Sequence, residues 1–331
     1  MPPRPLNRKQ SSKFAKSGRK PVRKQDFRDG EFASDLEAIF ARELLDTISK
    51  LRRAVSTVEI ERAIRQSLTE AIRALDAVFA ETDISNLVTS MTNEIIRAGL
   101  EQGPELARTS QISMRFDVAD PRAQAWARDR AGLLIRNIAD EIRVKVGSIT
   151  ERLLSGEITL REARNEISRS VGLHDRWQTA VDNSYEKTLE QLLDAGVDPD
   201  EAEILAQEAA DNYAQRLLKT RASNIARTEL ATAQNQGRYI HWQQLAEAGV
   251  INPAVSVKEW RTAPEFVSSK TDVCPICEPM NGIQAPLWSE FPEVDVVMPP
   301  AHPNCRCRAV LIVQPIEDVI AFVESQREAL G

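Results

Sequence analysis

The chain has 331 residues and a formal net charge of −6, with 42% hydrophobic but only 5% aromatic residues. This length suggests two domains, or one domain with extensions, and the few aromatic residues favour packed helices over a β-sandwich. The sequence lacks an apolar stretch of about 18 residues and a basic segment that leads into an apolar run. We therefore expect neither a transmembrane span nor a secretory signal peptide.

Charge is distributed unevenly along the chain. The first 25 residues carry nine of the 43 Lys and Arg residues and no acidic residue, which leaves 34 basic against 49 acidic residues for the rest, a net charge of −15. We predict that residues 1–27 form a disordered basic arm, since this segment cannot bury enough apolar surface to offset its ordering entropy. The arm could bind nucleic-acid phosphates or an acidic protein partner, or it could be a solvated tail. Its basic residues are Arg4, Arg8, Lys9, Lys13, Lys16, Arg19, Lys20, Arg23 and Lys24.

Residues 28–215 show apolar side chains at helical spacing, which predicts a helical interaction region. Gly103-Pro104 is expected to end one helix, and residues 104–118 to form a loop or a short strand. Asp120-Pro121 is expected to open the next helix, because proline suits the first helical turn. The expected helices cover about 36–51, 57–79, 83–101, 123–154, 159–171, a segment that ends at 195–196, and a last segment that begins at Asp198.

All four cysteines lie within residues 274–307, together with one of the three histidines. A Cys-x-x-Cys turn presents two thiols from one tight loop, as in zinc knuckles, and the second half offers either a His-x-x-Cys or a Cys-x-Cys pair. We favour a structural metal ion. A metal-free cluster of thiols and imidazole, or disulfides, which a reducing cytosol disfavours, remain open. The five candidates for a site that usually takes four ligands are Cys274, Cys277, His302, Cys305 and Cys307.

The other two histidines are expected to pack rather than to bind metal. His174 lies at an expected helix junction, and His241 stands beside Tyr239 and Trp242. A catalytic metal is also disfavoured, because the sequence contains no His-Glu-x-x-His or His-x-Glu pattern.

The C-terminal part alternates between a helix and short strands. We predict a helix over residues 222–248 that ends at Gly249, a turn at Asn281-Gly282 and a closing helix to Leu330. Strands are expected over 255–262 and 307–313, with a further short strand at 294–298. The expected fold class is mainly α: an elongated N-terminal helical region followed by a small α+β domain that the Cys/His cluster stabilises.

So small a sheet and one helix make a weak core, which gives the cluster a physical purpose. A metal ion that joins residues 274–277 to residues 302–307 would hold the sheet together across a long loop. Arg306 and Arg308 would offset the negative charge of metal-bound thiolates.

Several segments together resemble a known family. They are Asn224–Glu229 (NIARTE) with the helix through Ala233 and Gly237, Trp260-Arg-Thr262, Asp272–Cys277 (DVCPIC), Asn281-Gly282, and Pro299–Cys307 (PPAHPNCRC). Over about residues 216–315 the chain resembles the phage Mu F-like head morphogenesis (minor capsid) proteins, and residues 316–331 are expected to form a C-terminal helix after this domain. The signature residues are Arg227, Glu229, Trp260, Asp272, Gly282 and Arg306.

The resemblance implies a phage minor capsid protein that assists head assembly, packaging or DNA ejection. The implied partners are the portal protein, or the major capsid or scaffold protein, with packaged DNA contacted through the basic arm. The implied location is the virion, inside the capsid or at the portal vertex, and the host cytoplasm during assembly. Only 24 residues follow Cys307, so we expect no appended enzyme, and zinc is the expected structural ion.

Two other classes of function remain. A metal-dependent nuclease or transferase built around the Cys/His cluster and Glu229 would require an exposed cleft beside Glu229. We expect instead that Glu229 forms an ion pair with Arg227, Arg261 or Arg306. A DNA-binding zinc ribbon is disfavoured by the acidic residues of the 274–304 loop, which are Glu278, Glu290, Glu293 and Asp295.

Overall fold

A computed structural model describes residues 35–55, 58–110, 114–160, 162–163, 166–167, 171–262 and 274–313. The predicted basic arm, the predicted closing helix and the signature residue Asp272 lie outside these ranges.

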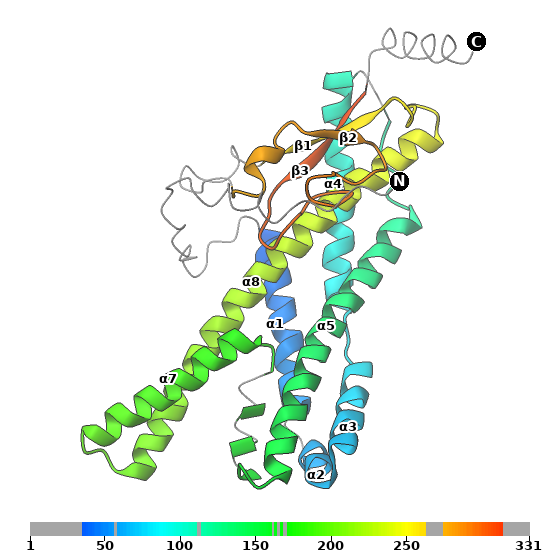
Figure 1. Cartoon of the computed structure of the whole chain (residues 1–331). Coiled ribbons are helices and arrows are strands. Elements are labelled where there is room, and N and C mark those ends of the chain that lie inside the picture. The colour runs from blue at the N-terminus through cyan, green and yellow to red at the C-terminus, as the bar shows by residue number, and fades with distance from the viewer. Residues whose placement is uncertain are drawn as a thin grey trace, which may run out of the picture. The chain divides into compact units, whose positions relative to one another are not determined.

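Helices make up most of the described residues, and three short strands complete the fold (Figure 1). The strands form one antiparallel sheet in the order β2-β1-β3, with β1 in the centre. The predicted mainly α fold with a small C-terminal sheet is confirmed. The helices are α1 (Asp35–Val55), α2 (Val58–Gln66), α3 (Leu68–Ala80), α4 (Ser85–Ser110), α5 (Pro121–Leu154), α7 (Asp175–Asp194) and α8 (Pro199–Glu247), and the strands are β1 (Val257–Arg261), β2 (Gln284–Pro286) and β3 (Arg308–Ile312).

The long helix α8 packs against α1, α4, α5 and α7 and, near its C-terminal end, against β3 (Figure 1). Its N-terminal half buries an alanine at every fourth position. Small side chains let neighbouring helices approach closely. Because four residues advance a helix by about 400°, the alanine stripe rotates by about 40° at each step. α8 therefore presents a close-packing surface to different partners along its length. The alanines are Ala202, Ala206, Ala210 and Ala214, followed by Ala222 and Ala226.

α8 approaches α4 very closely at Gly237. A Cβ atom added at Gly237 would lie 2.2 Å from the backbone oxygen of Ile95. No side chain fits in that space, so the two helix backbones nearly touch there.

Two predicted helix boundaries are wrong. The helix expected over 57–79 is divided into α2 and α3 at Ser67, whose Oγ accepts a hydrogen bond from the backbone N–H of Glu70 (3.2 Å). This Ser-x-x-Glu start was visible in the sequence. The helix expected to stop at Gly103-Pro104 instead continues as α4 to Ser110. Leu106 is buried beside Trp242 and Leu245, and this packing offsets the cost of an internal proline.

Other differences concern short segments. Met114–Asp117 is irregular and not a strand. Residues 294–298 contribute a single bridge between Phe291 and Val296, while β2 was not predicted. The two helical segments expected after Asp198 and from residue 222 are one continuous helix, so the predicted boundary at 215/216 falls inside α8.

Several predicted features are confirmed. α5 begins after the Asp120 cap, and α8 ends with Gly249 at φ +67°, where the N–H of Val250 donates to the backbone oxygen of Leu245 (2.8 Å). Thr159 caps a helical turn by accepting from the N–H of Glu162 (3.3 Å).

Both histidines that lie outside the cluster pack as predicted. His174 precedes α7 and lies against Trp177, with ring centroids 4.7 Å apart. His241 is fully buried and meets the ring of Phe116 edge-on, and burial lowers its pKa. Among the described helices, none combines the length and the apolar character that crossing a membrane requires.

The contact at Gly237 predicts a large effect of one added methyl group. We expect Gly237→Ala to lower the free energy of unfolding by about 3 kcal/mol, because the new Cβ forces α4 away from α8. Urea denaturation followed by circular dichroism measures this.

Gly132→Ala in α5 is the matched control, since its Cβ would meet only the flexible end of Arg136 at 3.4 Å. That change should raise stability by about 0.5–1 kcal/mol. If both variants gained stability, the close helix crossing would be wrong.

Candidate metal centre

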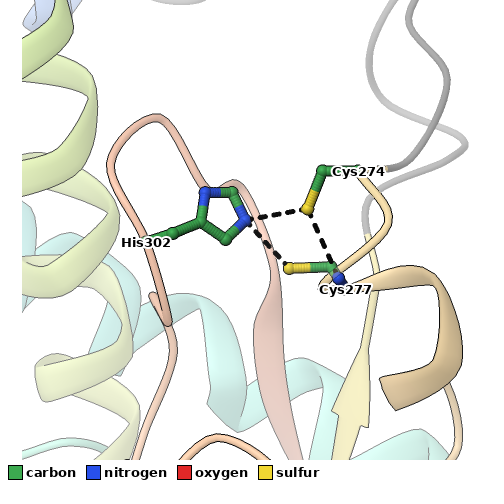
Figure 2. Close-up of side chains that lie close together, drawn as sticks. All are labelled: Cys274, Cys277 and His302. Atoms are coloured by element: carbon green, nitrogen blue, oxygen red, sulfur yellow. Dashed lines mark hydrogen bonds between the residues drawn. The ribbon is translucent and has the colours of Figure 1, made fainter. Parts of the chain in front are cut away.

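Two chain segments bring the predicted cysteines and His302 together. Cys274 and Cys277 lie on the turn that leads into a short 3-10 helix, Glu278–Met280, and the other three precede β3. Figure 2 shows the imidazole of His302 directed between the thiols of Cys274 and Cys277. Its Nε2 lies 2.9 Å from Sγ of Cys274 and 3.1 Å from Sγ of Cys277. All five residues proposed from the sequence therefore meet in one place.

The five ligand atoms form two overlapping groups that could hold a metal ion. One group is Cys274, Cys277 and His302, and the other is Cys277, Cys305 and Cys307, with the ligand atoms of each group within 4.8 Å of one another. Cys277 is common to both, and its Sγ lies 3.7 Å from that of Cys305. Two sulfurs on one tetrahedral zinc ion, each about 2.3 Å from it, are about 3.8 Å apart. The thiols and the imidazole are thus donors of the type and spacing that a zinc-like ion takes.

The surroundings of His302 favour ligation through one nitrogen. Its Nδ1 lies 2.8 Å from the backbone oxygen of Pro303, a contact in which Nδ1–H donates. This tautomer leaves the lone pair of Nε2 facing the two sulfurs. The backbone N–H of Cys277 also donates to Sγ of Cys274 (3.3 Å), which holds this sulfur at the turn.

The clustered thiols influence one another's protonation. The pKa of Cys305 is lowered because the thiols of Cys277 and Cys307 donate hydrogen bonds to its sulfur. The pKa of Cys277 is raised by its hydrogen bonds with the thiols of Cys305 and Cys307 and by burial. One thiolate therefore forms readily and further ionisation is opposed, whereas a bound divalent cation would favour the thiolate at every ligand.

Signature residues on β1 and in the following turn support the cluster. Trp260 is fully buried with Cys277, Cys305 and Cys307 in one apolar cluster, and its ring meets that of Phe291 edge-on at 5.2 Å. Gly282 adopts φ +84°, a conformation that favours glycine, and its N–H donates to the backbone oxygen of Trp260 (2.8 Å). This turn fixes the segment that carries Cys274 and Cys277 against β1.

A buried lysine anchors the loop after β2. The side chain of Lys258 in β1 is fully buried, and its Nζ donates to the backbone oxygens of Leu287 (3.2 Å) and Ser289. The ammonium also lies 5.1 Å from the ring centre of Phe291. Burial lowers the pKa of Lys258 to about 8.

Helix α8 holds the segment that carries the other three candidate ligands. Nη1 of Arg227 donates to Oδ1 of Asn304 (3.2 Å), and the backbone N–H of Asn304 donates to Oγ1 of Thr228 (2.9 Å). Arg227 also lies 3.7 Å from Glu37 of α1. Arg227 therefore links α8 to both α1 and the His302–Cys305 turn.

Asn235 is a structural residue that the sequence analysis missed. It is 1% exposed, donates to the backbone oxygen of Cys307 (3.1 Å) and accepts from the N–H of Ala309 (3.1 Å). It thus satisfies a buried donor and a buried acceptor at the start of β3. The sequence did contain one indication of this role: Asn235 follows Thr228 by seven positions, which places both polar side chains on the same face of a long helix.

Glu229 does not have the predicted partner. Its carboxylate accepts two hydrogen bonds from Arg130 of α5, at 2.6 and 3.0 Å, so this pair joins α8 to α5. Arg261 pairs instead with Glu259 (2.6 Å). The reason is that residue 229 lies on the helix face directed at α5, which local sequence does not reveal. Glu229 is also buried, which disagrees with the exposed cleft that the enzyme alternative requires.

The charge compensation predicted for Arg306 and Arg308 stays a prediction, and the structure places Arg306 near another guanidinium group. Burial lowers the pKa of Arg227, and the positive charge of Arg306 lowers it further, so the two guanidinium groups lie near each other. Nε of Arg306 is buried and has no hydrogen-bond partner among the described residues.

Comparison with known proteins gives one match. Residues 184–310 match the family model described as Phage Mu protein F like protein. The match begins within α7 and ends within β3, so it includes α8 and the whole Cys/His cluster. The predicted resemblance is confirmed over these residues. Neither the curated proteins nor the solved structures gave a match to the chain.

The role of Asn235 predicts a large loss of stability on truncation. Asn235→Ala should lower the free energy of unfolding by about 3 kcal/mol, because it leaves a buried N–H and a buried carbonyl without partners. The amide of Ala309 should also exchange its hydrogen faster in this variant, measured by mass spectrometry.

Gln234→Ala, at the neighbouring half-buried position, is the control and should change stability by less than about 0.5 kcal/mol. Equal effects of the two changes, with no faster exchange at Ala309, would contradict the assigned role.

Proposed function

We propose that this chain, which is phage Mu F-like over residues 184–310, acts as a head morphogenesis protein and a minor structural component of the phage head. The observation that carries this proposal is the family match over the region that contains α8, the sheet and the Cys/His cluster. The working location would be the virion, inside the capsid or at the portal vertex, with the host cytoplasm as the site of assembly.

The proposed role is structural and not enzymatic. The acidic signature residue of α8, Glu229, is held by Arg130 in an interhelical pair, so it serves the packing of α5 on α8. Cys277, Cys305 and Cys307 lie among buried apolar side chains, with Cys274 packed against them, which suits a cross-link better than a site that admits substrate.

We infer that the cluster holds one structural zinc ion. Cys274, Cys277 and His302 would supply three ligands, and Cys305 or Cys307 the fourth. When bound, zinc would provide a covalent-like link between the Cys274–Met280 turn and the loop before β3. β1 and α8 already hold both segments in place. The metal link would add stability to a domain whose own apolar core is small.

The α7–α8 hairpin is the proposed docking surface for a head protein. Residues 182–211 carry ten acidic side chains and one lysine. Three large apolar side chains are exposed among them: Leu193, Ile204 and Leu205. This combination fits a basic surface with apolar pockets, and we propose the portal protein, or the major capsid or scaffold protein, as the partner. The basic residues of the N-terminal arm are proposed to contact packaged DNA.

Metal content tests the zinc assignment. Elemental analysis of the purified protein should find about one zinc per chain, and Cys277→Ser should lose it together with several degrees of melting temperature, because Cys277 belongs to both ligand groups.

Cys305→Ser and Cys307→Ser form the matched pair, and only the variant that removes the fourth ligand should lose zinc. Protein purified under reducing conditions without metal, with an unchanged melting temperature in Cys277→Ser, would rule out the zinc site and leave the head-protein proposal standing.

Co-purification tests the docking proposal. Tagged chain, co-expressed with the portal and capsid proteins of the phage that encodes it, should retain one of them on an affinity column. Ile204→Ser combined with Leu205→Ser should reduce the retained partner about tenfold, because it removes exposed apolar side chains from the proposed contact.

Leu154→Ser, at another exposed apolar position at the end of α5, is the control and should retain the partner fully. Retention unchanged in the double variant would show that the hairpin is not the docking surface. Failure of the wild-type chain to retain any head protein would contradict the proposed function.

A further inference from the structure

Two of the clustered thiols lie close enough for a cross-link other than the proposed zinc ion. The Sγ atoms of Cys277 and Cys305 lie 3.7 Å apart, in van der Waals contact. They come from the two segments that the proposed zinc ion would join. Each cysteine is only 2% exposed, and both belong to the apolar cluster around Trp260 and Phe291.

The surroundings of the other thiols favour this pair over the alternatives. His302 Nε2 lies near both Cys274 and Cys277, at 2.9 and 3.1 Å from their Sγ atoms, but only Sγ of Cys274 also accepts from the backbone N–H of Cys277. The backbone of Cys307 is held by Asn235 as β3 begins, so this residue has little freedom to move. A bond of about 2.05 Å between Cys277 and Cys305 requires their sulfurs to approach by about 1.7 Å, which side-chain rotation in the loops can supply.

We propose that Cys277 and Cys305 form a disulfide when the chain is free of metal and meets a peroxide. This inference rests on the proposed role of the cluster as a cross-link between the two segments. The disulfide would be the link that these segments have when the thiols are oxidised.

The reaction needs only the two thiols and hydrogen peroxide. One thiolate attacks a peroxide oxygen, which gives a sulfenic acid and releases hydroxide. The second thiolate then attacks that sulfur, forms the S–S bond and expels a second hydroxide. The two thiol protons neutralise both hydroxides, so two thiols and one peroxide yield one disulfide and two waters.

The disulfide would preserve the fold in a second redox environment. A head protein is made in a reducing cytosol, where thiols persist and bind metal, and then leaves the cell inside a particle. Outside the cell, the Cys277–Cys305 bond would join the same two segments that zinc joins inside it. The cross-link would therefore outlast the loss of the ion.

Peptide mapping of the full chain tests this proposal. Reduced protein is stripped with a chelator, shown by circular dichroism to remain folded, treated with hydrogen peroxide, and digested without reductant. The expected product is one peptide pair that links Cys277 to Cys305, and a melting temperature roughly 5 °C above that of the reduced, metal-free chain. A bond within one loop, 274 to 277 or 305 to 307, or overoxidised thiols without a disulfide, would overturn the proposal.

Two variants and a zinc arm separate this result from the proposed function. Cys274→Ser should still form the disulfide, and Cys277→Ser should not. Zinc added before peroxide should slow formation at least about tenfold, because bound thiolates are shielded. If zinc has no effect and the disulfide still forms, the disulfide stands and the zinc assignment fails. If zinc binds but the stripped, folded chain never forms the disulfide, only this inference fails.

Discussion

The attachment of the loop before β3 to α8 is the interaction on which the C-terminal structure depends. The side chain of Asn235 forms hydrogen bonds with both the carbonyl of Cys307 and the N–H of Ala309, while Oγ1 of Thr228 accepts a hydrogen bond from the N–H of Asn304. Each bond satisfies a backbone group that burial would otherwise leave unpaired. The cysteines that precede β3 therefore reach the Cys274–Cys277 turn from a position that α8 determines.

The same helix connects that site to the rest of the chain. α8 extends without a break from the α7–α8 hairpin to the sheet, and it meets α4 so closely at Gly237 that no Cβ fits. The pair of Glu229 with Arg130 and the contact of Arg227 with Glu37 add α5 and α1 to this helix. One continuous helix therefore connects the α7–α8 hairpin to the Cys/His cluster.

The Cys/His cluster completes a small domain whose sheet has only three short strands. Such a sheet offers little apolar surface to bury, so a link between its loops contributes much of the stability that a larger core would provide. Zinc and a Cys277–Cys305 disulfide are the two forms that we propose for that link, suited to reducing and oxidising surroundings. Neither form requires an open coordination position, which agrees with a structural role.

The sequence by itself determined the helical character of the chain, the strands β1 and β3, the C-cap at Gly249 and the meeting of four cysteines with His302. These features depend on neighbouring residues: apolar periodicity, capping side chains and ligand spacing act over a few positions. Tertiary structure alone decided that α4 continues past Pro104, because Leu106 packs against Trp242 of α8. It also decided that Glu229 pairs with Arg130 and that Asn235 holds β3. Those partners lie about 70 to 140 positions apart in the chain, and only the packing of α4, α5 and β3 on α8 brings them within contact distance.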